Sequence, residues 1–234
     1  PYPVRQMTEQ TLAAIETETP PSLRRPGFMS VVKSDKKALV GLIVLAIFLA
    51  TAILAPLISP YDPNDMDFEM MEAPSMVHPL GTDDLGRDLL SRIIHGTQIS
   101  LFVGISTVAI SLFFGVALGV AAGYYGGWLD NIIMRYIDLQ WAFPNFIIAV
   151  YLVAVFGSGL LNVIIAISLA FLDDFARIAR GMVLVIKEEQ YVAAARTVGT
   201  SDFCIMWRHI APNAVAPIIV QATVSISYAI LGEA

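Results

Sequence analysis

Charged residues are scarce in this chain. They make up 15% of its 234 residues, whereas soluble domains usually carry about 25%. Apolar residues reach 56%, and the mean hydropathy is +0.69. Disordered chains need low hydrophobicity and high charge, so this composition excludes disorder. It indicates a protein that folds in a lipid bilayer.

Other scarcities exclude further classes of function. The net charge of −6 leaves no basic surplus to neutralise phosphates, which argues against nucleic-acid binding. The single cysteine, Cys204, can form neither an internal disulfide nor a cysteine-cluster metal site. The histidines His78, His95 and His209 have no carboxylate or cysteine at metal-ligand spacing. Because the sequence contains no Gly-x-x-x-x-Gly-Lys-Ser/Thr loop, ATP chemistry cannot reside on this chain, and we expect no cofactor on it.

Long uncharged runs dominate the sequence instead. Ala38–Ile58 holds 21 uncharged residues, closed by Ser59 and Pro60, and a helix of that length crosses a hydrocarbon core of about 30 Å. A cleaved secretory signal has an apolar region of only about 7–15 residues, so we expect an uncleaved first span. Four further spans are predicted at roughly 93–129, 131–156, 160–180 and 211–231. The chain ends at Ala234 inside an apolar run, and we expect more sequence beyond it.

Basic residues predict the orientation of these spans. One group precedes the first span and comprises Arg5, Arg24, Arg25, Lys33, Lys36 and Lys37. A second group precedes the last span and comprises Arg177, Arg180, Lys187, Arg196 and Arg208. Four spans separate the two groups, so both lie on one side, which the positive-inside rule makes cytoplasmic. The N-terminus is therefore expected inside and the acidic segment 60–92 outside.

The predicted spans divide the chain into four parts. We expect a cytoplasmic tail and surface segment at 1–36, the first span at 37–59, an external loop at 60–98 and a helical core at 99–234. The external loop contains four methionines, Met66, Met70, Met71 and Met76. Their thioethers suit copper(I), and the alternative is that they serve as flexible packing in a folded cap.

Glycine, proline and charged residues predict how the spans pack. Gly115, Gly119 and Gly123 form a small-xxx-small stripe, which lets membrane helices approach closely. Pro144 should kink the third span, with Gln140, Asn145 and Phe146 as possible residues of a translocation path.

Charged residues cluster near two span ends. Arg135 and Asp138 are three residues apart and are expected to form a local ion pair. A similar cluster, Asp173, Asp174, Arg177 and Arg180, lies where the fourth span ends. Such charges usually face protein or water rather than lipid.

Residues 187–213 carry the strongest functional signal. Gln190–Val198 predicts a short helix that ends at Gly199. Polar residues then offer caps for a second short helix, Phe203–Ile210, closed off by Pro212. Ala193–Ala195 would let another protein come close, and the second helix is too apolar for a solvated loop. We expect a compact cytoplasmic protrusion that another protein covers.

The spacing of Ala193-Ala194-Ala195, Gly199 and Ile210-Ala211-Pro212-Asn213 resembles the coupling motif of ABC importer permeases. That motif reads Glu-Ala-Ala, a glycine and a closing Leu-Pro, so Ala193 replaces the glutamate and Ala211 the leucine. Three further stretches resemble the dipeptide/oligopeptide/nickel permeases of the C-subunit type: Gly81–Arg92, Gly123–Asp130 and Ile230–Ala234.

The resemblance implies an all-α membrane protein with the transmembrane domain of a type I ABC importer. Five spans would lie in this chain and a sixth beyond Ala234. The chain would be a permease subunit rather than an enzyme, moving di- or oligopeptides or a related small solute across the cytoplasmic membrane of a prokaryote. Implied partners are a B-type permease subunit, two ATPase subunits that bind ATP and Mg, and an extracytoplasmic solute-binding protein.

The resemblance also implies which residues contact the ATPases. Coupling helices at about 188–211 would present Glu189, Ala193, Ala194, Ala195, Arg196, Gly199, Asp202 and Pro212. The alternative is a secondary transporter or channel without an ATPase, in which charged residues at 135–138 and 173–180 couple ions. No second inverted half is visible in the sequence to support that alternative.

Overall fold

The computed structural model describes residues 35–157 and 159–233. The predicted N-terminal tail lies almost wholly outside these residues. In chain order the elements are α3 (Lys36–Ile58), α4 (Leu89–Tyr125), α5 (Gly127–Trp141), α6 (Asn145–Phe156), α7 (Leu160–Ala170), α8 (Leu172–Ile186), α9 (Gln190–Thr197), α10 (Asp202–Cys204), the π-helix η1 (Ile205–Ile210) and α11 (Ala211–Glu233). Apart from one bridge between Thr82 and Asp88, the described residues form no β-structure. The all-α prediction is confirmed.

Within residues 35–157 and 159–233, three helical stretches are long and apolar enough to cross a membrane: Lys36–Ile58, Leu89–Tyr125 and Asp202–Gly232. Helices α5 and α6 pass the same test together, but they are bent by 90° at the break between them. The described residues therefore contain three such helices, or four if this bent pair is one span, where the sequence predicts five. The difference lies in the predicted span 160–180, which is divided at Phe171 into the short helices α7 and α8.

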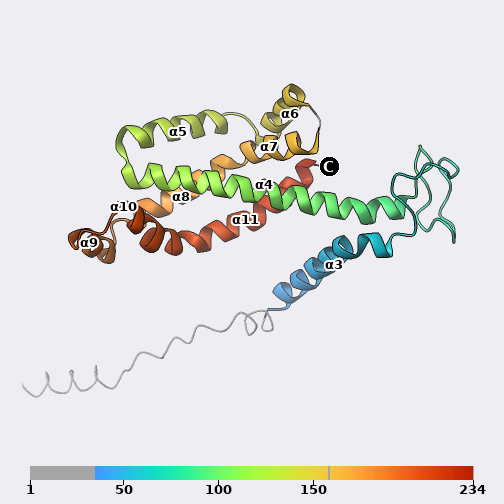
Figure 1. The fold of residues 1–234 in the computed structure, drawn as a ribbon, viewed down its shortest axis with the longest axis horizontal. Coiled ribbons are helices and arrows are strands. Elements are labelled where there is room, and N and C mark those ends of the chain that lie inside the picture. Colours follow the sequence, from blue (N-terminus) through green and yellow to red (C-terminus); the bar gives the residue numbers. More distant parts are fainter. Residues whose placement is uncertain (1–34, 158, 234) are drawn as a thin grey trace, which may run out of the picture. The chain divides into compact units, whose positions relative to one another are not determined.

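The chain divides into two compact units at a boundary between Ala50 and Thr51, inside α3. The larger unit, residues 51–234, contains all helices from α4 onward, and Figure 1 shows α4 and α11 running along α8.

The glycine stripe of α4 packs closely against α8. A Cβ added to Gly115 would lie 2.6 Å from the Leu172 carbonyl oxygen, and one added to Gly119 would meet the Ala176 carbonyl. A Cβ at Gly123 would lie 2.9 Å from Cβ of Val183. All three contacts are with α8, so the predicted close packing is confirmed, and its partner is the amphipathic α8.

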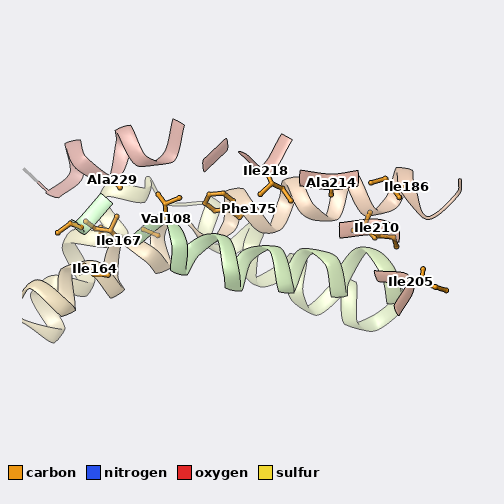
Figure 2. Packing of buried hydrophobic residues seen from close by; sticks show 14 of the residues in the cluster. Val108, Ile164, Ile167, Phe175, Ile186, Ile205, Ile210, Ala214, Ile218 and Ala229 are labelled. Carbon is orange, nitrogen blue, oxygen red and sulfur yellow. The ribbon is translucent and has the colours of Figure 1, made fainter. Parts of the chain in front are cut away.

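Most of the buried apolar side chains form an elongated cluster, and Ile137, Leu172 and Ala176 form a smaller one. Figure 2 shows the elongated cluster as a row running from Ile164 and Ala229 at one end to Ile210 and Ile205 at the other. Phe175 of α8 is fully buried and lies near the middle of this row. Because Ile205 belongs to the segment after the glycine turn, the predicted protrusion shares the core of the transmembrane helices.

Pro144 breaks the third predicted span more strongly than a kink. Helix α5 ends at Trp141 and α6 begins at Asn145, with Pro144 in an extended conformation (φ −59°, ψ 132°). Proline disfavours helix in the residue before it and lacks an N–H to donate. The 90° bend between α5 and α6 follows from this interruption.

The predicted ion pair between Arg135 and Asp138 is wrong. Asp138 accepts instead from Arg177 of α8, at 3.1 Å, and the Arg177 guanidinium also lies 4.2 Å from the ring centroid of Trp141. The aromatic face holds this guanidinium beside Asp138. Arg180 donates to both carboxylate oxygens of Asp130, at 2.5 and 2.7 Å, so charged residues join α5 to α8.

The segment between α3 and α4 folds into a cap around a buried carboxylate. Asp88 is fully buried and caps α4 by accepting from Ser91 N, at 2.8 Å, and from Ser91 Oγ. Its other oxygen lies 3.0 Å from Nδ1 of buried His78. Burial alone would raise the pKa of Asp88, but the hydrogen bonds from Ser91 and His78 hold it below its ordinary value.

The four methionines of this cap point outward. Met66 is 55% exposed and Met76 is completely exposed, with Met70 and Met71 between these values. The packing role predicted for them inside the cap is therefore wrong.

Candidate coupling and translocation sites

The turn after α9 depends on the backbone of Gly199. Its φ is +81°, a left-handed conformation that favours glycine. Gly199 N–H donates to the Arg196 carbonyl, and Thr200 N–H donates to the Ala195 carbonyl, at 3.0 and 3.1 Å. These two bonds form a Schellman motif. The predicted helix end at Gly199 is confirmed.

The second predicted helix begins as expected but does not end at Pro212. Ser201 caps it by accepting from Cys204 N. The helix then widens into η1, in which Ala211 N–H donates to the Met206 carbonyl five residues back, and it continues directly into α11. Proline cannot donate this kind of bond, and a wide turn leaves room for its ring. The predicted closure at Pro212 is therefore wrong.

Residues 188–213 form a protruding segment, the knob, which is held in place by its own buried side chains. Val192, Ile205 and Ile210 are fully buried. Lys187 Nζ donates to the Gly123 carbonyl, at 3.0 Å, where α4 ends. The knob is therefore fixed to the α4–α8 seam.

A tyrosine at the end of α4 adds a second attachment. The Tyr124 hydroxyl donates to Asp202 Oδ1, at 2.5 Å, and the Arg196 guanidinium lies 5.3 Å from the Tyr124 ring centroid. Sequence reasoning missed Tyr124. The aromatic pair Tyr124-Tyr125 indicated a membrane interface, but nothing in its spacing indicated a partner 78 residues away.

The outer face of the knob carries most of the predicted coupling residues. Exposed members of that set are Glu189, Ala193, Ala194, Arg196, Gly199, Asp202 and Pro212. Ala195 is half-buried and packs against the core instead.

Large apolar side chains lie on the same knob. Val198, Phe203 and Trp207 are 85%, 74% and 73% exposed. Phe203 and Trp207 flank an open hollow of about 430 Å³ that also includes Arg208 and Pro212. Val198 was not predicted, although its position beside the glycine turn makes an apolar residue there a recognisable signal.

The predicted path residues separate into two places. Asn145 and Phe146 line a cavity of about 570 Å³ between α6, α7, α8 and α11. Gln140 does not line it. The buried Gln140 side chain instead donates from Nε2 to the Leu169 carbonyl, at 2.6 Å, and joins α5 to α7.

Asp173 and Asp174 differ in their surroundings, although they are adjacent on α8. Asp173 is fully buried, and neither of its carboxylate oxygens has a hydrogen-bond partner among the described residues. Asp174 lines the cavity and accepts a hydrogen bond from Gln221 of α11, at 3.3 Å.

Comparison with known proteins identifies related sequences along most of the chain. Residues 115–234 match the family described as binding-protein-dependent transport system inner membrane component. Residues 28–74 match the N-terminal TM domain of oligopeptide transport permease C.

Curated relatives agree with these matches. The dipeptide transport system permease protein DppC of Alkalihalophilus pseudofirmus is 42% identical over 205 residues, which cover 87% of this chain and 67% of the relative. The glutathione transport system permease protein GsiD of Pectobacterium atrosepticum is 43% identical, over 83% of this chain and 65% of the relative. The di/tripeptide transport system permease protein DppC of Pseudomonas aeruginosa is 40% identical, over 92% and 74%. The chain thus spans about two thirds of the length of the first two relatives.

Proposed function

This chain belongs to the inner-membrane permease components of binding-protein-dependent ABC importers, in the oligopeptide permease C branch, and we propose from this premise that it moves short peptides into the cell. The names of the relatives support this substrate class, since they specify dipeptides, di- and tripeptides, and glutathione. The relatives are transport permeases, and this chain is a transport subunit rather than an enzyme.

The knob at 188–213 is the proposed docking site for an ATPase subunit. The observation that carries this proposal is an exposed apolar surface, Val198, Phe203 and Trp207, on a segment whose base is fully buried in the core. A rigid protrusion transmits the movement of a partner to the helices from which it projects. The exposed alanines of α9 admit a close approach at the same face.

The remaining parts of the assembly follow from this role. An importer of this family combines a partner permease, ATPase subunits and a binding protein. The partner permease is proposed to be of the B type, and two ATPase subunits are proposed to carry ATP and Mg. The N-terminus is proposed to lie in the cytoplasm, because both basic groups of the sequence then obey the positive-inside rule.

An ATP-independent secondary transporter or channel is not favoured. Three of the charged residues on which that alternative depended are engaged in structural pairs, Asp138 with Arg177 and Arg180 with Asp130. The relatives are components of transport systems that depend on a binding protein.

The docking proposal is tested by co-purification from native membranes in mild detergent. Trp207→Ala should reduce the recovery of ATPase subunits at least tenfold, because truncating a central aromatic side chain often costs about 2 kcal/mol or more at an interface. Trp128→Ala is the matched control, since Trp128 is 74% exposed but lies at the start of α5. Equal recovery with both variants, or no ATPase with the parent chain, would contradict the proposal.

A further inference from the structure

The cavity between α6, α7, α8 and α11 has the size of a small-molecule site. Its volume of about 570 Å³ lies within the range of roughly 300–1,000 Å³ that is typical of such sites. In Figure 1, α6, α7 and the C-terminal end of α11 lie together. Side chains such as Val150, Val153 and Ile167 make its wall mainly apolar.

Asp174 is the one charged residue among the described residues that line this cavity. It is half-buried, and its Oδ2 accepts a hydrogen bond from Gln221 Nε2 at 3.3 Å, while Trp141 also bonds this carboxylate. The nearest basic residue along α8, Arg177, attracts Asp174 by its charge, but its hydrogen bond goes to Asp138 and its guanidinium stacks on Trp141. Charged residues at membrane depth usually face a partner or a solute pathway, and Asp174 faces the cavity.

Aromatic side chains complete the wall. Phe146 and Tyr228 line the cavity and are 67% and 59% exposed. Aromatic faces attract ammonium groups, and a carboxylate supplies the opposite charge. The combination suits a ligand with an ammonium group on an apolar body. It does not suit an anion, because no described lining residue carries positive charge.

We propose that this cavity binds the protonated amino terminus of a short apolar peptide, with Asp174 as its counter-ion. The inference rests on the proposed function, since it assigns a place on the permease to the same substrate class. It adds a specificity rule. Peptides with a free amino terminus are held at Asp174, and peptides with a blocked amino terminus are not.

The test measures peptide binding directly on the purified importer complex, without ATP and without the binding protein. Cys204→Ser removes the single native thiol, and Val150→Cys places a new thiol in the cavity wall, where Val150 is 50% exposed. Labelling of this thiol by N-ethylmaleimide is followed with increasing alanyl-phenylalanine or N-acetyl-alanyl-phenylalanine. The free dipeptide should slow labelling, and the acetylated dipeptide should require about tenfold more, because a charge-assisted hydrogen bond is lost.

Three further variants assign the effect to Asp174. Asp174→Asn should raise the protecting concentration of the free dipeptide about tenfold and leave that of the acetylated dipeptide unchanged, whereas Asp174→Glu should retain most of the protection. Asp173→Asn is the matched control, since Asp173 is adjacent but does not line the cavity. Equal protection by both dipeptides, no effect of Asp174→Asn, or a thiol that is never labelled in the complex would each overturn the proposal. ATPase co-purification is read on the same samples, so a failed docking proposal is recognised separately.

Discussion

The hydroxyl of Tyr124, at the end of α4, donates a 2.5 Å hydrogen bond to Asp202, the first residue after the Ser201 cap of the second knob helix. The pair joins the transmembrane core to the knob across 78 residues of sequence. Together with the bond from Lys187 to the Gly123 carbonyl, it attaches the knob at the point where α4 packs on α8. Movement of the knob must therefore act on that seam.

Removal of the Tyr124 hydroxyl should weaken the coupling between the knob and the transmembrane helices without unfolding the protein. Tyr124→Phe keeps the ring under Arg196 and removes only the donor to Asp202. A hydrogen bond to a charged group contributes about 1.5–3 kcal/mol, so we expect peptide uptake per ATP hydrolysed to fall several-fold in reconstituted vesicles. Tyr125→Phe is the control at the neighbouring exposed tyrosine and should leave the ratio unchanged. An unaltered ratio in Tyr124→Phe would show that the bond does not contribute to coupling.

Adding a methyl group to the glycine stripe of α4 should destabilise the protein, whereas the same change at a glycine with open space around it should not. Gly119→Ala introduces a methyl group against the Ala176 carbonyl and 2.8 Å from Cβ of Ala179. Overpacking of this kind typically costs about 1–3 kcal/mol, so the midpoint of thermal unfolding in detergent should fall by several degrees. Gly181→Ala lies in α8 with open space around its Cβ, and it should be neutral or slightly stabilising. Equal midpoints for the two variants would contradict the packing assigned to Gly119.

Local signals in the sequence predict the parts of this fold that depend on near neighbours. The small-residue spacing of Gly115, Gly119 and Gly123 predicts a close helix contact, and the left-handed Gly199 predicts the end of α9, because both follow from backbone geometry. The identity of the partner helix, α8, is not contained in that spacing. Long uncharged runs likewise predict apolar helices but not the break at Phe171, which depends on how α7 and α8 pack on α4.

Pairs of residues distant in sequence were beyond prediction for the same reason. Asp138 has a basic residue three positions away, yet it pairs with Arg177, because Trp141 and the approach of α8 place that guanidinium beside it. Pro212 carried a local signal for a helix end, but the wide turn of η1 accommodates it. The path candidates were chosen for polar or aromatic character on a kinked span. Gln140, which donates to the Leu169 carbonyl, therefore could not be told from Asn145, which lines the cavity.

Two substitutions of Gly199 should differ in their effect on the docking of the ATPase subunits. Because φ is +81° while the space around a Cβ is open, the conformation and not the volume should decide the outcome. Gly199→Asn should retain ATPase recovery, since asparagine tolerates left-handed backbone, whereas Gly199→Val should lose it, at a strain of about 1–2 kcal/mol. Co-purification of ATPase subunits at equal permease yield measures both. Similar recovery for the two variants would mean that the turn geometry is not needed for docking.

The buried Asp88 predicts that the cap between α3 and α4 is sensitive to acid. Its carboxylate accepts from Ser91 and lies beside His78, and these bonds hold its pKa below the ordinary value despite burial. A group with a lowered folded pKa contributes stability that is fully present above its unfolded pKa of about 3.9 and is lost as the pH falls through the folded value. Hydrogen exchange of cap amides in detergent should therefore stay slow from pH 7 to about pH 4 after correction for intrinsic rates, and protection should decrease below that range.

Two aspartate variants separate Asp88 from the other acidic residues of the cap. Asp88→Asn should reduce amide protection already at neutral pH and flatten its decrease in acid, because the amide no longer titrates and can offer only one acceptor oxygen to Ser91 and His78. Asp84→Asn changes an exposed aspartate of the same loop and should reproduce the parent profile. If Asp88→Asn also followed the parent profile, the acid sensitivity would originate elsewhere in the cap, with Asp83 the next group to test, since it bonds Arg87 and Arg92 and its pKa is likewise lowered against the effect of burial by hydrogen bonds from Arg87 and Leu85.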